Sequence, residues 1–190
     1  MAEIKNEWFR DCSGLESIRL DNVKTIRYFA FDNCGKLKSI GNLSRLECVE
    51  KYAFAGTTSL NIELSMPSMT GELPDDVFAH SGITKIVNLG KVTSLHGTGP
   101  YDRGPFGWCY NLTQVVFPPT LTSIGAWSFQ CCYALEWIKV LSATPPTLGD
   151  NAFYDTNDDF IIYVPAASVN AYKTAKNWSN LASRIRAIVD

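Results

Sequence analysis

Phenylalanine at a nearly constant spacing is the feature that most constrains the fold of this chain. Seven of these residues follow one another at intervals of 22, 23, 24, 28, 23 and 24 residues. They stand at Phe9, Phe31, Phe54, Phe78, Phe106, Phe129 and Phe153. A fixed period between about 20 and 50 residues is typical of a solenoid, in which each repeat is one small structural unit. The spacing therefore predicts a stack of similar rungs.

Other positions repeat in step with the phenylalanines. A small residue stands three positions after each of them: Cys12, Cys34, Thr57, Ser81, Cys109, Cys132 and Thr156. In most units a leucine follows three residues later, and an isoleucine or valine three residues after that, although the third unit slips at Glu63. The segments 15–20, 112–117 and 135–140 alternate apolar and polar residues, so we expect each to form a short strand.

One strand per repeat cannot bury its own apolar face. Stacked repeats would place such strands side by side, about 4.7–4.9 Å apart, in one parallel sheet along the solenoid. The second half of each repeat would return the chain on the opposite face, and each phenylalanine would fill the core between turns. The apolar pairs predicted to mark that return are Val23 and Ile26, Leu46 and Val49, Val92 and Leu95, and Leu121 and Ile124.

The repeat has the form AF-x-x-C-x-x-L-x-x-I, followed by L-T-S-I-G-x-x-x-F. It resembles the BspA-like class of bacterial leucine-rich repeats, and the best matches are residues 31–40, 106–115 and 118–140. The resemblance implies an α/β fold, namely a right-handed leucine-rich-repeat solenoid of short parallel strands and turns with about six repeats. It also implies a module, usually found on bacterial surfaces, that binds other proteins or host components.

We expect one domain over residues 1–190, with repeats in 1–153 and a C-terminal cap in 154–190. Residues 160–165 are predicted to form the final strand, and residues 166–188 a helix that Ser168 caps and that covers the last sheet edge. A strand followed by a short helix resembles the cap common in the same family. The apolar contacts expected from this helix are Val169, Tyr172, Trp178, Leu181 and Ile185.

Composition limits the partners and the location. The net charge of −2 argues against nucleic acid as a partner, since binding to phosphates needs clustered Lys and Arg. No apolar run of 18 residues occurs, so we expect no membrane span. The first residues do not have the pattern of a signal peptide. A solenoid normally needs a polar cap, and this chain opens almost directly on its first phenylalanine unit. The chain is therefore interpreted as a trimmed piece of an exported protein, at the cell surface or secreted, and a cytoplasmic or virion protein is the alternative.

The six cysteines are interpreted as mainly structural. Four of them share the small-residue position, and no C-x-x-C pair or zinc-ligand spacing occurs. We expect a column of buried thiols, while disulfides between Cys12 and Cys34 or between Cys109 and Cys132 stay open as an alternative. The acidic segment 155–159 lacks the glycine and the distant glutamate of a calcium loop, so it is interpreted as a turn. No cofactor and no metal are expected.

No catalytic motif is evident, so we expect no enzyme. The candidate partner-binding residues are instead those predicted to point outward from the C-terminal strands, together with the tip of a glycine-rich insertion at 95–106. Because Trp and Tyr are over-represented at binding hot spots, these positions favour a protein contact, unless the cap helix covers them. They are Val87, Val116, Trp137, Lys139 and Tyr163 on the strands, and Tyr101, Asp102 and Arg103 in the insertion.

The predicted function is that of a non-enzymatic protein-binding or adhesion module of a bacterial cell-surface or secreted leucine-rich-repeat protein. Its partner would be a host or bacterial protein whose identity the sequence does not give, and the oligomeric state is left open. The alternative is a structural assembly component, such as a part of a phage virion or an appendage. A chain without a signal peptide would suit that alternative.

Overall fold

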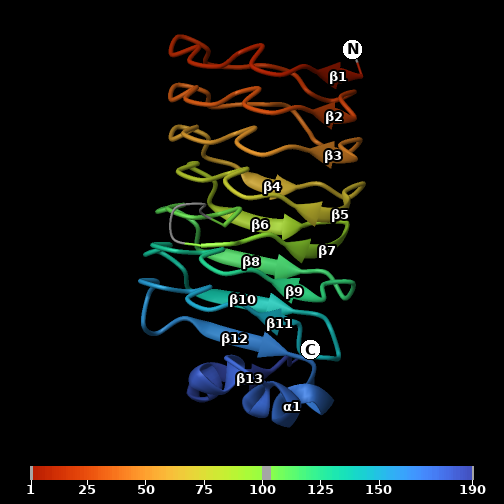
Figure 1. Ribbon diagram of the computed structural model, residues 1–190, viewed down its shortest axis with the longest axis vertical. Coiled ribbons are helices and arrows are strands. Elements are labelled where there is room, and N and C mark those ends of the chain that lie inside the picture. The colour runs from red at the N-terminus through yellow and green to blue at the C-terminus, as the bar shows by residue number, and fades with distance from the viewer. Residues whose placement is uncertain (1, 100–103, 190) are drawn as a thin grey trace.

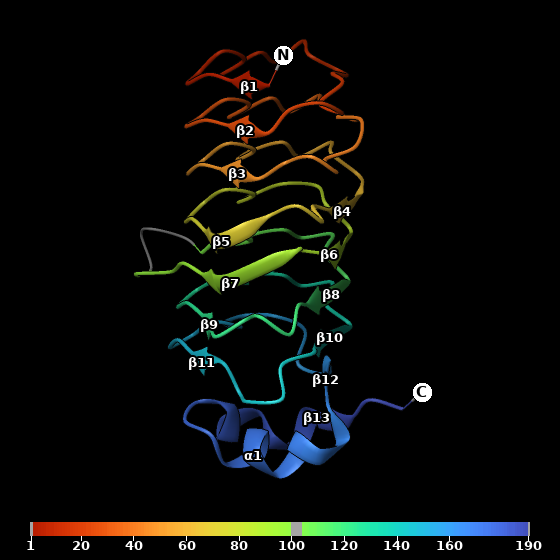
Figure 2. The same cartoon turned by 90° about the vertical axis from the view of Figure 1, so that its right-hand side faces the viewer.

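The computed structural model describes residues 2–99 and 104–189. Figures 1 and 2 show a rod of stacked rungs, with the N-terminus at one end and a short helical cap at the other. The described residues form parallel strands in three sheets. The predicted solenoid and its C-terminal cap are therefore confirmed.

The largest sheet has the strand order β13-β12-β10-β8-β6-β4. Its strands are parallel, and all but the two at its edges pair with a neighbour on each side. The predicted strands in 112–117 and 135–140 are confirmed by two of its members, β8 and β10. The six strands are β4 (Glu63–Ser65), β6 (Lys85–Asn88), β8 (Gln114–Phe117), β10 (Trp137–Val140), β12 (Ile161–Val164) and β13 (Ile185–Ala187).

Two smaller sheets carry the other face of the rungs. They have the orders β1-β2-β3 and β11-β9-β7-β5. The four apolar pairs predicted to mark the return of the chain lie here or beside these strands, and all eight residues are buried. The strands are β1 (Glu3–Ile4), β2 (Thr25–Ile26), β3 (Cys48–Val49), β5 (Thr70–Leu73), β7 (Lys91–Leu95), β9 (Ser123–Ile124) and β11 (Thr147–Leu148).

The strand predicted over residues 15–20 is wrong. This segment forms only an isolated parallel bridge between Ser17 and Ser39. The reason is the slip in the third unit, because on this face β4 pairs with β6 alone and the large sheet therefore ends before the first two rungs. Backbone bonds still join the two rungs, as in the 3.0 Å contact from the N–H of Leu20 to the carbonyl of Ile40.

The phenylalanines form one continuous ladder from Phe9 to Phe153. Successive ring centroids lie 5.1–5.6 Å apart and the planes differ by 2–15°. Phe160 closes the ladder, with its ring 5.2 Å from Phe153 and tilted by 41°. The predicted aromatic core is therefore confirmed.

Most of these phenylalanines lie between two residues with positive φ. The first stands at position −2 relative to the phenylalanine and the second at position +2. Asn33, for example, has φ 59°. The left-handed region costs a residue with a side chain about 1–2 kcal/mol. Bonds between rungs offset this cost, since the N–H groups of Phe31 and Asn33 each donate to the next rung at 2.8 Å. These paired bends form the left-hand border of the rod in Figure 1, which we call the turn edge. In the C-terminal part of the rod the turn edge consists of residues 104–111, 126–134 and 149–157.

The single helix predicted over residues 166–188 is wrong. The cap contains η1 (Ala166–Ser168), α1 (Val169–Thr174) and η2 (Trp178–Arg184), followed by β13. The break lies at Ala175, which is extended, and at Asn177, whose φ is 65°. It allows Trp178 to turn inward, where its side chain is fully buried and its Nε1–H donates to the carbonyl of Pro146 at 2.7 Å.

Two further details of the cap differ from the prediction. Ser168 makes no capping bond to the helix, and its hydroxyl donates to the carbonyl of Ala143 at 2.6 Å. The last strand is β13, which contains Ile185 and pairs with β12. The edge of β12 is thus extended by another strand, and the helical segments α1 and η1 contact that strand at the end of the rod. In the described part of the chain no helix has the length and hydrophobicity to cross a membrane.

Candidate functional site

The candidate residues of the strands lie on consecutive members of the large sheet: Val87 on β6, Val116 on β8, Trp137 and Lys139 on β10, and Tyr163 on β12. The register sets their rows. Lys139 lies between Val116 and Tyr163, whereas Trp137 lies between Gln114 and Ile161. Lys139 therefore occupies the middle of the row, and Trp137 stands one row nearer to the turn edge.

Trp137 and Tyr163 nevertheless meet across this offset. Their ring centroids are 6.4 Å apart and the planes differ by 74°, an edge-to-face contact. With Lys139 they line an open pocket of about 270 Å³, whose other wall is Ile188 and Val189. All three side chains are half-buried, so the surface is partly bordered by the end of the chain but not closed by the cap helix. We call these three residues the strand-face cluster.

The insertion is described only at its two ends, and Tyr101, Asp102 and Arg103 lie outside the described residues. The ends lie close to the backbone of residues 125–128. A Cβ atom on Gly97 would stand 2.1 Å from the carbonyl oxygen of Ala126, and one on Gly104 would stand 2.2 Å from the Cα of Ser128. This segment belongs to the turn edge, so the described residues do not join the insertion to the strand-face cluster.

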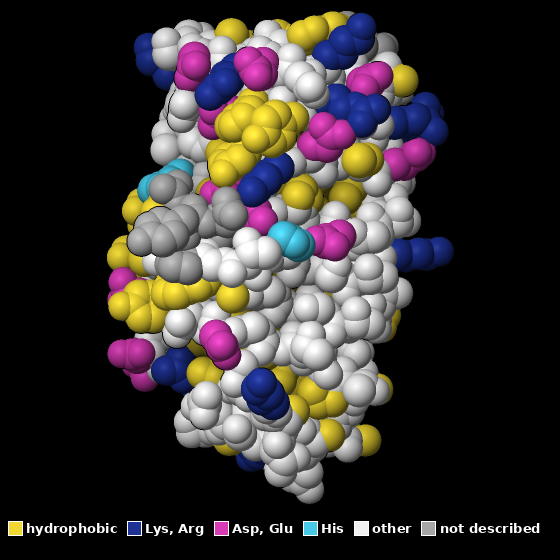
Figure 3. All heavy atoms as spheres, viewed as in Figure 1, with side chains coloured by type: hydrophobic (Ala, Val, Ile, Leu, Met, Phe, Trp, Pro, Cys, Tyr) yellow, Lys and Arg dark blue, Asp and Glu magenta, His cyan; other side chains and the backbone are white. Residues whose placement is uncertain are grey.

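Sequence reasoning missed a row of aromatic side chains on the turn edge. Tyr110, Tyr133 and Tyr154 are 48%, 54% and 52% exposed. The rings of Tyr110 and Tyr133 stack with centroids 5.6 Å apart and planes 5° apart, while Tyr154 lies 5.3 Å from Trp127. Figure 3 shows hydrophobic side chains gathered along this edge. The signal was a tyrosine four positions after the phenylalanine in two successive units.

The carboxylate of Asp155 connects Tyr133 with the rung that carries Tyr154. The hydroxyl of Tyr133 donates to Oδ2 of Asp155 at 3.2 Å, and Asp155 directly follows Tyr154. The hydrogen bond with the Cys131 side chain, together with partial burial and the nearby carboxylate, raises the pKa of Tyr133. This hydroxyl therefore remains a donor at neutral pH. We call Tyr110, Tyr133, Tyr154 and Trp127 the aromatic edge.

Comparison with known proteins agrees with this architecture. The sequence matches the BspA type leucine rich repeat region in six copies, over residues 1–98 and 102–181. The chain belongs to this family. A crystal structure of a leucine-rich repeat protein from Bacteroides ovatus ATCC 8483 is similar, with a TM-score of 0.56, 21% identity and coverage of 86% of this chain. The BspA-type chain spans 49% of that protein, and the likeness shows the fold alone. No curated protein matches the chain.

The column of cysteines in this BspA-type solenoid consists of free thiols. Those of Cys34, Cys109 and Cys132 are fully buried, which confirms the prediction for these three, while Cys12 is half-buried. The Sγ of Cys109 donates to the carbonyl of Phe78 at 3.1 Å, and Cys34 and Cys132 make equivalent bonds. Burial raises the pKa of Cys109 to about 12. The thiol therefore stays protonated and inert at neutral pH.

Thiol labelling should follow this burial. At pH 8 we expect a maleimide or iodoacetamide to modify the two accessible cysteines, Cys48 and Cys12, first. The four buried cysteines should react only after unfolding, because reaction requires both access and a thiolate. Peptide mass spectrometry of the labelled chain, with and without denaturant, measures this order. Rapid modification of Cys109 in the native protein would contradict the buried column.

The acidic segment 155–159 forms a turn. The backbone N–H of Asp159 donates to the side-chain oxygen of Asn157 at 3.0 Å, and Asp155 is engaged by Tyr133. No group of three or more His, Cys, Asp or Glu in the described ranges is placed to hold a metal ion.

Proposed function

We propose that this chain is a non-enzymatic binding module of a cell-surface or secreted BspA-type protein, and that it holds a host or bacterial protein partner. The observation that carries the proposal is the strand-face cluster, in which two half-buried aromatic rings meet edge to face beside an open pocket. Leucine-rich repeats generally mediate protein interactions, and Trp and Tyr are the residues most enriched at binding hot spots.

The scaffold keeps this cluster in place. β10 pairs with β8 on one side and β12 on the other, so the backbone of Trp137 and Lys139 is held in a ladder on both sides. A backbone fixed in this way has little conformational entropy left to lose when a partner binds. The aromatic pair supplies apolar contact, and the ammonium group of Lys139 supplies a polar group at the rim, as in ordinary protein interfaces.

We expect Trp137→Ala to weaken binding of a protein partner by a factor of about 30 or more, the loss typical of a hot-spot residue. The partner is first isolated by pull-down from host extracts and from bacterial surface fractions. Its dissociation constant for the wild type and the variant is then measured by biolayer interferometry. A partially exposed side chain should be removable with a small loss of stability, which thermal unfolding checks.

Trp8→Ala is the matched control, because Trp8 is 45% exposed and lies on the first rung, far from the cluster along the rod. It should leave the affinity unchanged. Equal affinity of Trp137→Ala and wild type for a partner that binds with submicromolar affinity would refute the assignment of the cluster as the binding surface.

A further inference from the structure

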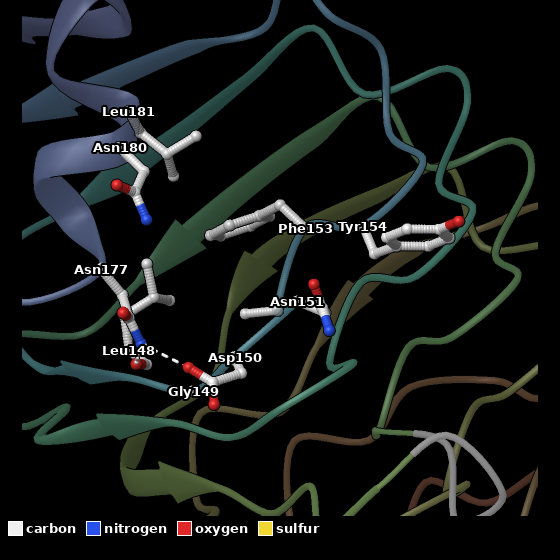
Figure 4. Close-up of a pocket in the computed structure, with 10 residues that line it drawn as sticks. Leu148, Gly149, Asp150, Asn151, Phe153, Tyr154, Asn177, Asn180 and Leu181 are labelled. Carbon is white, nitrogen blue, oxygen red and sulfur yellow. Dashed lines mark hydrogen bonds between the residues drawn. The ribbon is translucent and has the colours of Figure 1, made fainter.

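A second pocket lies where the last repeat meets the cap. It has a volume of about 500 Å³ and is lined by residues 148–154 of the repeat and by Asn177, Asn180 and Leu181 of the cap. Figure 4 shows Asn180 and Leu181 facing Phe153 across the pocket, with Asn177 and Asp150 below them. Tyr154 lies beyond Phe153, and its ring points away from the side chains of the cap. Its volume is that of a small-molecule site, and none of the strand-face cluster lines it.

The polar lining of this pocket consists of carboxamides and one carboxylate. Asn177 is fixed by two bonds from its Nδ2, to the carbonyl of Leu148 at 2.7 Å and to Oδ1 of Asp150 at 3.0 Å. Asn151 and Asn180 are exposed, and their carboxamides make no hydrogen bond to any described residue. Each of these two groups can donate and accept at once.

The charges of the lining residues limit the class of ligand that this pocket can bind. None of the ten lining residues is Lys, Arg or His, so the pocket offers no cation to a phosphate, sulfate or carboxylate group. The single carboxylate, Asp150, is an acceptor for a neutral donor. The lining is therefore suited to a neutral ligand that carries many hydroxyl groups, each of which donates and accepts.

Aromatic rings extend the pocket along the rod. Tyr154 forms one wall with half of its surface exposed, and Trp127 lies beside it. Asp155, the next residue, is bonded to Tyr133, which stacks on Tyr110. The aromatic edge thus leads away from the pocket from one rung to the next. An exposed aromatic face attracts the flat C–H face of a sugar ring, because the face carries negative charge density and the C–H groups carry positive charge.

We propose that this pocket binds a neutral oligosaccharide, with Tyr154 as the stacking surface and with Asn151, Asn177, Asn180 and Asp150 as hydroxyl partners. Further sugar residues would continue over Tyr133 and Tyr110. A peptide is less suited to the site, since peptides dock on open sheet edges or in apolar grooves, and the walls here are turns and a short helix. This activity is separate from protein binding at the strand-face cluster.

The test uses the full chain and a panel of hexasaccharides of glucose, mannose, galactose and N-acetylglucosamine, measured by isothermal titration calorimetry. We expect at least one of them to bind with a dissociation constant of about 1 mM or lower. Tyr154→Ala and Asn180→Ala should each weaken that binding by a factor of about 10, as expected for loss of a stacking surface or of hydrogen bonds. Both residues are exposed, so the variants should fold, which circular dichroism checks.

Tyr28→Ala and Asn61→Ala are the matched controls, because they remove an exposed tyrosine and an exposed asparagine far from the pocket. Both should bind like the wild type, and so should Trp137→Ala. The proposal is overturned if no hexasaccharide binds at 10 mM. It is also overturned if Tyr154→Ala and Asn180→Ala bind the sugar as well as the wild type. None of these results would affect the protein-binding proposal, which rests on Trp137.

Discussion

Replacing Phe78 by Ala is expected to lower the free energy of unfolding by about 3–5 kcal/mol, since the change removes a fully buried ring and leaves a cavity. The ring lies between two others, 5.3 Å from Phe54 and 5.6 Å from Phe106, with planes within 3° of both. Neighbouring rungs cannot close the gap without breaking the bond from the N–H of Phe78 to the carbonyl of Pro105. At about 2–4 °C per kcal/mol for a chain of this size, the melting temperature should fall by about 6–20 °C.

Phe9→Ala is the matched control for this prediction. Phe9 occupies the same position in the first repeat but is only half-buried and stacks on one neighbour, Phe31, at 5.1 Å. Its loss should cost about half as much or less, because the removed surface is already partly in water. Thermal and urea unfolding of both variants measures the difference. If the two cost the same, the ladder would not act as a shared core.

The period of the sequence predicted the ladder, because each phenylalanine sits in the same environment and the pattern repeats seven times. It did not predict the bends on either side. Asn33 is a residue type often found at positive φ, but Phe29, Tyr52 and Trp127 are not, and they adopt φ values of 55–62° only because bonds between rungs hold them there. Such conformations depend on neighbouring repeats, so a local reading of the sequence does not reveal them.

The cap is a second region whose conformation could not be predicted from the local sequence. Residues 166–188 were predicted to be helical, yet the chain leaves the helix at Ala175, and Trp178 reaches the carbonyl of Pro146. Burial of one tryptophan with its N–H satisfied outweighs the helix propensity of a few residues. Tertiary contacts therefore determine the backbone conformation of the cap. They also create the pocket at Asn177, which no motif in the sequence predicted.

The strand-face cluster was the easier surface to place, because alternation along a strand puts every second residue on one face. Trp137, Lys139 and Tyr163 could be assigned to this face in this way. Their rows could not, since the register depends on which residues of two strands pair. The aromatic edge lies in turns, where no period of two or 3.6 residues applies, and only the recurrence of tyrosine between repeats marked it.

Trp178→Ala is expected to unfold the cap while most of the repeats stay folded. The side chain is fully buried, packs edge to face on Tyr172 at 5.2 Å and donates its N–H to Pro146, so its removal should cost about 3–5 kcal/mol. In a solenoid each unit contacts only its neighbours, and the loss should therefore stay near the C-terminus. Hydrogen exchange should show faster exchange over residues 166–188 and unchanged protection at the second and third rungs.

Two milder variants separate packing from hydrogen bonding in the cap. Trp178→Phe keeps a ring and leaves the carbonyl of Pro146 without its donor, and Tyr172→Phe removes the bond from the hydroxyl to the carbonyl of Ser142 at 2.8 Å. Each should lower the free energy of unfolding by about 1–3 kcal/mol.

An unfolded cap would uncover β12 as an open parallel edge, so Trp178→Ala should also self-associate, which light scattering measures. The milder variants should scatter light like the wild type. Exchange that rises equally along the whole rod in Trp178→Ala would instead mean that the repeats fold as one unit and that the cap is required by all of them.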